Sequence, residues 1–287
     1  MSEQRISRRE LEQMRENLST RDIEIVGSVS AHRFLTTRQI CRLHFADKPT
    51  ETAALRSANR TLAKLRDMRL LVPLERRIGG VRAGSGAYVW SLGHIGGRLL
   101  RRADQEQTSI RLQREYEPSP TFLEHTLAVA EICIRLCEAD ARGQITLLEV
   151  EHEPECWRPY NGSGGATARL KPDLAVVTAT DHFEDHWFIE VDLATEPPSR
   201  ILRACQAYEE YRRSGSEQRR LGLFPAVVWI EPTAKRKQMI ETHIVKADVI
   251  HHDLFKVITL DELEPLMKAG PEYGTDRPSA AEDRHAS

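Results

Sequence analysis

The chain has 287 residues, of which 40% are hydrophobic and 29% charged, which suits one large or two modest globular domains. No apolar run approaches the roughly 20 residues that cross a bilayer, and the opening stretch MSEQRISRRE lacks the apolar core of a secretory signal. The five cysteines are scattered and odd in number, which argues against a disulfide framework. These features predict a cytoplasmic protein that does not associate with membranes.

The net charge of −2 conceals an asymmetry along the chain. Residues 1–118 carry 22 basic and 14 acidic side chains, whereas the remainder carries 19 basic and 29 acidic ones. A basic segment favours nucleic acid, because binding releases the counterions that surround the phosphates. An acidic segment should not bind DNA unaided unless some of its carboxylates hold a metal ion. Drift of surface charge is the alternative explanation.

Apolar spacing in the basic part predicts three helices after a loosely held polar leader at 1–20. The first runs from about Asp22 to Ala31. The second begins at Thr36, because Thr36 and Gln39 form a capping-box sequence. The third runs from about Glu51 to Met68. Its predicted buried face consists of Leu55, Leu62, Leu65 and Met68.

A hairpin is expected next, with strands at 70–74 and 88–92 around a glycine-rich tip. Three helices followed by a basic hairpin is the order of a winged helix-turn-helix, predicted over residues 20–95. Arginine and asparagine suit guanine and adenine edges, and hairpin arginines suit phosphate or the minor groove, so the expected partner is double-stranded DNA. The alternative to DNA contact is that the polar residues of the third helix form an ordinary solvated face. The candidate DNA-binding residues are Arg56, Asn59, Arg60 and Lys64 on the third helix and Arg76, Arg77 and Arg82 at the hairpin.

A polar, arginine-rich linker with some helix is predicted at 96–118, followed by an α/β domain at 119–268. Ser119-Pro120 begins a helix that extends to about Leu136. Strands are expected at 145–150, 170–177, 187–192, 224–230 and 254–260, with helices at 199–213 and 234–244. Small, polar and charged residues predict a disordered tail at 270–287.

Two of these strands each place a carboxylate within or at the end of an apolar run, namely Asp173 and Glu190. Burying a carboxylate is costly unless it is paired, hydrogen-bonded or metal-bound. We therefore expect both to face one cleft, where their oxygens, a DNA phosphate and waters would suit Mg²⁺ or Mn²⁺. Such a metal would activate water and stabilise charge on the phosphate. A structural hydrogen-bonded pair is the alternative.

Pro172-Asp173 followed by Glu190, with the strand–strand–helix order, resembles the PD-(D/E)xK signature of the restriction-endonuclease-like superfamily. The resemblance implies a mixed-sheet nuclease-type domain. It also implies a further acidic ligand at Glu124, beside His125. Asp192 occupies the position of the signature's lysine, so the positive charge of that lysine has to come from another residue. Candidates are Lys171, predicted on the strand face of Asp173, then Arg203, with neutral Gln206 as a substitute.

A narrower resemblance joins Glu124-His125-Thr126, Pro172-Asp173, Glu190-Val191-Asp192 with Thr195-Glu196, and a helix with Tyr208. Together with the winged helix, this order is similar to the replication-relaxation family, over about residues 20–260. The family is linked to plasmid and mobile-element DNA and is similar to mobilisation relaxases. Its members often have a lysine on the helix before the tyrosine, where this chain has Arg203-Ala204.

Two functions are compatible with these features. The first is metal-dependent nicking at a specific DNA site by a mobile-element enzyme. The second is a non-catalytic DNA-binding regulator or replication accessory. Its nuclease-type domain would form a homodimer or bind other replication or mobilisation proteins. The missing lysine favours the second, so enzymatic activity stays open. The candidate site comprises Asp173, Glu190 and Glu124 as metal ligands, Asp192, Lys171 and Arg203 as further catalytic residues, and His125, Glu196 and Gln206 beside them.

Overall fold

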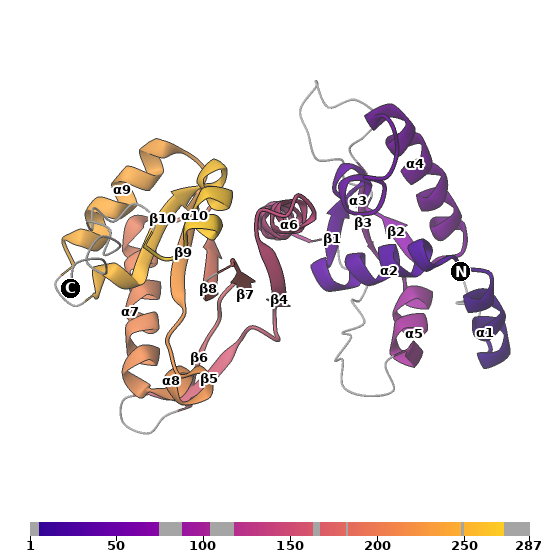
Figure 1. The fold of residues 1–287 in the computed structure, drawn as a ribbon. Helices are drawn as coiled ribbons and strands as arrows, with labels where there is room; N and C mark the ends of the chain where they lie inside the picture. Colours follow the sequence, from indigo (N-terminus) through magenta and orange to yellow (C-terminus); the bar gives the residue numbers. More distant parts are fainter. Residues whose placement is uncertain are drawn as a thin grey trace, which may run out of the picture. The chain divides into compact units, whose positions relative to one another are not determined.

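The structure is a computed structural model that describes residues 6–74, 88–103, 118–162, 167–181, 183–247 and 250–272. Its contacts divide the chain into two compact units, Met1–Cys137 and Glu138–Ser287, each a mixture of helices and strands (Figure 1). The division falls within one helix, whereas the boundary expected from the sequence is at residue 119. Among the helices described, none is long and apolar enough to traverse a bilayer.

The first unit consists of helices around a small antiparallel sheet with strand order β1-β3-β2. In chain order its elements are α1 (Arg8–Glu16), α2 (Thr20–His32), β1 (Phe34–Thr36), α3 (Thr37–His44), α4 (Glu51–Asp67), β2 (Leu71–Pro73), β3 (Val89–Leu92), α5 (His94–Ala103) and the start of α6 (Pro120–Ala141). The three helices and two flanking strands predicted from the sequence are present; β1 was not predicted.

Local hydrogen bonds explain where the central helices begin. The Thr36 hydroxyl accepts from the Gln39 backbone N–H at 3.1 Å, and the Gln39 side chain accepts from the Thr36 N–H at 3.0 Å. This capping box confirms the predicted start of α3. A second capping box, between Ser19 and Asp22, begins α2.

The buried face of α4 is close to the predicted one. Leu62 and Leu65 are fully buried, while Leu55 and Met68 pack partly against the core. Ala54 and Ala58 complete the face. Because these residues recur every three or four positions, the opposite face of α4 is left to solvent.

Two expectations for the first unit are corrected. Part of the polar leader forms α1, whose Leu11 is buried in the core, so this part is packed rather than loose. The predicted linker begins inside α5, which buries Ile95 and Leu99.

A Cβ on Gly93, just before α5, would lie 2.3 Å from the Arg69 carbonyl oxygen, so this close approach requires glycine. Residues 104–117, the rest of the expected linker, lie outside the described residues, as do hairpin residues 75–87.

The second unit is built on a mixed five-stranded sheet with strand order β10-β9-β8-β7-β4. Strands β8, β9 and β10 are parallel, whereas β4 and β7 run antiparallel to their neighbours. Its elements are β4 (Thr146–His152), β5 (Arg158–Asn161), β6 (Thr167–Leu170), β7 (Leu174–Ala179), β8 (Glu184–Val191), α7 (Pro198–Ser214), α8 (Ser216–Leu221), β9 (Ala226–Glu231), α9 (Ala234–Val245), the 3₁₀ turns His252–Leu254 and Leu260–Glu262, β10 (Phe255–Thr259) and α10 (Leu263–Ala269).

The single strand predicted over 170–177 is wrong. The chain forms β6 up to Leu170 and resumes with β7 at Leu174, and β6 pairs with β5 in a separate two-stranded ribbon. Pro172 lies at the interruption, and proline has no N–H to donate to a strand ladder. Lys171 and Asp173 therefore do not share one strand. The predicted tail beyond Glu272 lies outside the described residues.

Candidate functional site

Asp173 and Glu190 meet at one edge of the five-stranded sheet. Because β7 runs antiparallel to β8, the start of β7 lies beside the end of β8, and Leu174 is paired with Ile189. The Asp173 N–H donates to the Ile189 carbonyl at 3.2 Å, and the Val191 N–H donates to Asp173 Oδ2 at 2.8 Å. These bonds hold the Asp173 carboxylate against the residues that flank Glu190.

A buried tyrosine fixes the second carboxylate. Tyr208 of α7 donates from its hydroxyl to Glu190 Oε1 at 2.6 Å. Its ring packs on Phe188, with ring centroids 5.8 Å apart, and the side chain is 1% exposed. Sequence reasoning missed this contact, because nothing in the spacing shows which side of α7 faces Glu190.

Burial and a neighbouring carboxylate raise the proton affinity of Glu190. Burial, and then the negative charge of Asp173, raise the pKa of Glu190 well above its ordinary value, despite the hydrogen bond from Tyr208. Glu153, just after β4, adds to this effect and was not among the predicted residues. Such a group binds either a proton or a cation, so the geometry agrees with a cation site and also with a structural pair.

Tyrosines of the second unit are poorly placed for nucleophilic attack. Tyr160, Tyr208 and Tyr211 are 7%, 1% and 2% exposed. The hydroxyls of Tyr208 and Tyr211 donate to Glu190 and Glu217. Within the described part of this unit, no tyrosine therefore presents its oxygen to an incoming phosphate.

Asp192, which was expected at the lysine position of the nuclease signature, belongs to a different cluster. It is 7% exposed, and its Oδ2 accepts from Arg236 Nε of α9 at 2.7 Å. The Arg236 guanidinium also donates to the Glu196 carbonyl at 2.7 Å, which ties down the loop after β8. Ala194, in the left-handed region at φ 57°, donates its N–H to Asp192 Oδ1 at 2.9 Å. Asp192 thus shapes the loop beside Glu190.

Glu231, at the end of β9, completes this cluster and was not predicted. It is 1% exposed, its oxygens have no hydrogen-bond partner in the described structure, and its Oε2 lies 3.6 Å from Arg236 Nε. Burial, and then the neighbouring Asp192, raise its pKa to about 8. The Arg236 guanidinium therefore lies beside two buried carboxyl groups, those of Asp192 and Glu231.

The other second-unit candidates are exposed or contact other residues. Lys171 places its Nζ 4.8 Å from the centre of the Trp157 ring. Arg203 and Gln206 are exposed on α7. The Glu196 carboxylate pairs with Arg200 at 2.8 Å. Asp173 and Glu190 thus lie together as expected, whereas the break at Pro172 prevents the strand position that was expected for Lys171.

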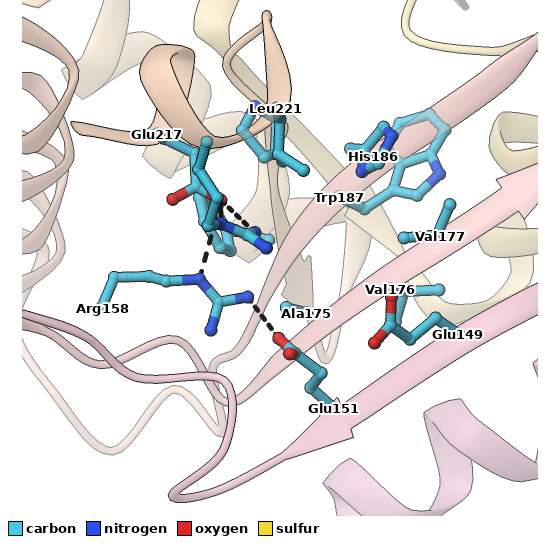
Figure 2. A pocket seen from close by; sticks show the side chains of 13 residues that line it. Glu149, Glu151, Arg158, Ala175, Val176, Val177, His186, Trp187, Glu217 and Leu221 are labelled. Carbon is cyan, nitrogen blue, oxygen red and sulfur yellow. Dashed lines mark hydrogen bonds and ion pairs between the residues drawn. The ribbon is translucent and has the colours of Figure 1, made fainter. Parts of the chain in front are cut away.

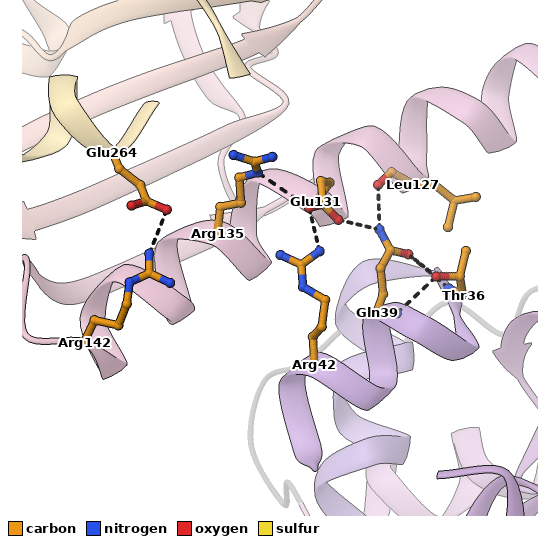
Figure 3. A network of polar contacts seen from close by, with 8 residues as sticks. All are labelled: Thr36, Gln39, Arg42, Leu127, Glu131, Arg135, Arg142 and Glu264. Atoms are coloured by element: carbon orange, nitrogen blue, oxygen red, sulfur yellow. Dashed lines mark hydrogen bonds and ion pairs between the residues drawn. The ribbon is translucent and has the colours of Figure 1, made fainter. Parts of the chain in front are cut away.

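Glu124 and His125 lie near the start of α6, in the first unit, where Glu124 is exposed and His125 half-buried. Figure 3 shows how this helix is joined to α3. The Gln39 amide donates to the Leu127 carbonyl at 3.1 Å, and Arg42 pairs with Glu131 at 2.6 Å. Gln39 therefore caps α3 with its oxygen and holds α6 with its nitrogen.

The exposed face of α4 carries most of the described DNA-binding candidates. Arg56, Asn59 and Arg60 are exposed. Lys64 differs, because its Nζ lies 2.7 Å from Oδ2 of the buried Asp22 and so joins α4 to α2. The hairpin candidates Arg76, Arg77 and Arg82 lie outside the described residues.

Comparison with known families gives one match. The sequence model described as Replication-relaxation matches residues 26–227. Comparisons with curated proteins and with solved structures give no significant match. The matched residues make up more than half of the chain and include both α4 and the Asp173–Glu190 pair. The chain therefore belongs to the replication-relaxation family.

Proposed function

We propose that the chain binds double-stranded DNA through its first unit and acts in the replication or relaxation of mobile-element DNA. In this proposal α2, α3 and α4 with strands β2 and β3 form a winged helix-turn-helix, and α4 is the recognition helix. The supporting observations are the element order, the short connection between α3 and α4, and the family to which the chain belongs.

The observation that carries this proposal is the exposed face of α4. Arg56 and Arg60 are one helical turn apart, and Asn59 lies beside them. Neither arginine pairs with a carboxylate among the described residues, so their charge is available to a polyanion. Arginine donates two parallel hydrogen bonds to guanine, and asparagine does the same to adenine, so this set suits the major groove.

Replacing both Arg56 and Arg60 by alanine is expected to weaken DNA binding at least about tenfold, because each base or phosphate contact contributes about 1–3 kcal/mol. Fluorescence anisotropy with a labelled 30-base-pair duplex at low salt measures this. The double variant Arg9→Ala/Arg15→Ala, on exposed positions of α1, is the matched control for net charge. An equal loss in the control would show that overall charge, rather than α4, drives binding.

For the second unit, we propose that Asp173 and Glu190 hold a divalent cation, Mg²⁺ or Mn²⁺, for DNA nicking. Their oxygens are the ligands these ions prefer, and burial, followed by the charge of Asp173, raises the pKa of Glu190, so that a bound cation would stabilise its ionised form. Tyr208 would keep Glu190 oriented, and the bond from Val191 would keep Asp173 in place. When bound, such an ion polarises phosphate oxygens and lowers the pKa of water.

Nicking is tested on supercoiled plasmid that carries the DNA flanking the gene of this chain, with Mg²⁺ or Mn²⁺. We expect open-circle product with the wild type and none with Asp173→Asn, because the variant loses a charged ligand. Calorimetry should show metal binding that strengthens as pH rises, since the ion has to displace a proton from Glu190. Glu184→Gln, at the exposed far end of β8, is the control. Undiminished nicking by Asp173→Asn would rule out this site.

A second candidate function is a non-catalytic DNA-binding regulator or replication accessory. The observation that favours it is Asp192, which occupies the lysine position of the nuclease signature and is engaged by Arg236. This function predicts DNA binding that survives chelation and Glu190→Gln, with no nicking under any metal. Binding that requires a divalent cation would contradict it.

A further inference from the structure

The ribbon formed by β5 and β6 has two different faces. Tyr160 and Leu170 point toward α7 and are buried with Arg158, whereas the alternate positions point outward. The outward residues are Pro159, Asn161, Thr167 and Arg169, and all four are exposed. No outward position carries an acid.

At the end of this outer face, the ring of Trp157 contacts two cationic side chains. The register pairs Pro159 with Arg169, so continuing it by two residues places Trp157 opposite Lys171. Lys171 Nζ lies 4.8 Å and the Arg169 guanidinium carbon 5.7 Å from the centre of the Trp157 ring. Both distances are those of cation–π contacts, which hold the head groups in place without neutralising them.

Buried ion pairs hold the inner face of the ribbon rigid. Arg158 of β5 donates to the Glu151 carboxylate of β4, and its Nε lies 3.6 Å from Glu217 Oε1 of α8 (Figure 2). Glu217 is fully buried and also accepts from Tyr211. The ribbon is therefore a pre-organised surface rather than a loose hairpin, which lowers the entropy cost of using it for binding.

We propose that the outer face of the β5–β6 ribbon is a second DNA-contacting surface, on which Arg169 and Lys171 bind backbone phosphates of a duplex. Among the described residues, neither cation has a carboxylate partner, so both charges face solvent. A two-stranded ribbon is also narrow enough to follow a groove of B-DNA. Lys171 is two residues from Asp173 along the chain. The inference rests on the proposed DNA binding of the chain.

The test compares the double variant Arg169→Gln/Lys171→Gln with the wild-type full chain, on the labelled duplex over a range of salt concentrations. Losing two phosphate contacts should lower the slope of log affinity against log salt by up to about 2. The control Lys235→Gln/Lys268→Gln removes the same charge from exposed positions of α9 and α10 and should leave the slope unchanged. A ribbon variant with the wild-type slope would overturn the inference.

Lysine footprinting gives a second readout that does not depend on any variant. Acetylation of Lys171, followed by mass spectrometry with and without duplex, should fall when DNA is present, whereas that of Lys235 should not change. Equal acetylation of Lys171 with and without duplex would contradict DNA contact by the ribbon. If the wild type binds no DNA, both the proposed function and this inference fail. If only Arg56→Ala/Arg60→Ala weakens binding, the inference alone fails.

Discussion

Replacing Arg236 by alanine is expected to lower the free energy of unfolding of the second unit by about 3–5 kcal/mol, because it leaves the buried Asp192 carboxylate without its cation. The Arg236 side chain is 10% exposed, and those of Asp192 and Glu231 are 5% and 0% exposed. Little solvent therefore reaches these groups in the folded chain. The bond to the Glu196 carbonyl would be lost as well. Chemical denaturation of the full chain measures the change.

The neighbouring Lys237→Ala supplies the matched control. Lys237 follows Arg236 on α9 and pairs with Glu262 at 2.6 Å, but these side chains are 23% and 31% exposed. Partly exposed pairs contribute about 1 kcal/mol or less, so a small effect is expected. Combining Arg236→Met with Asp192→Asn and Glu231→Gln should recover much of the loss, since no buried charge remains. A similar loss in Arg236→Ala and Lys237→Ala would contradict the buried-cluster explanation.

This cluster also bears on the proposed metal site. Asp192 and Glu190 are two residues apart at the end of β8, and Arg236 holds the loop that follows. Arg236 does not contact Glu190 among the bonds described, so we regard it as a positioning residue. The Arg236 guanidinium is the cation of this cluster, and it is engaged by Asp192 and Glu231.

Much of the first unit was predictable because its signals are local. The Thr36–Gln39 capping box and the spacing of Leu62 and Leu65 depend only on residues a few positions apart. By contrast, Lys64 looks like a member of the exposed basic face, and only the fold shows that Asp22 of another helix binds it. Long-range partners of this kind leave no periodic trace in a sequence.

In the second unit, too, the sequence does not show which distant residues come into contact. An apolar run from Leu170 to Val177 has the composition of one strand, yet Pro172 divides it between a ribbon and the main sheet. The meeting of Asp173 and Glu190 was predictable, because consecutive strands are commonly neighbours. Tyr208, Glu153 and Glu231 were missed, because their proximity to these acids depends on how a helix packs and in which order the strands are arranged.

The pH dependence of stability provides a second large effect. Glu231 has a pKa of about 8 in the folded chain, raised by burial and Asp192 from an ordinary value of 4.5. Between these values the folded state keeps a proton that the unfolded chain has released, so the free energy of unfolding falls as pH rises through this window. One such proton gives a slope of at most about 1.4 kcal/mol per pH unit, and Glu190 acts in the same direction.

Glu231→Gln is therefore expected to flatten the decline in stability between pH 5 and pH 8, because an amide is neutral throughout. Urea denaturation at several pH values measures the slope. Glu262→Gln is the control: hydrogen bonds from Lys237 and Thr259 outweigh the effect of burial and lower the pKa of Glu262, so it titrates below this window. An unchanged slope in Glu231→Gln would mean that Arg236 keeps both acids ionised. The Arg236 cluster would then be a three-charge ion group rather than a pair with a retained proton.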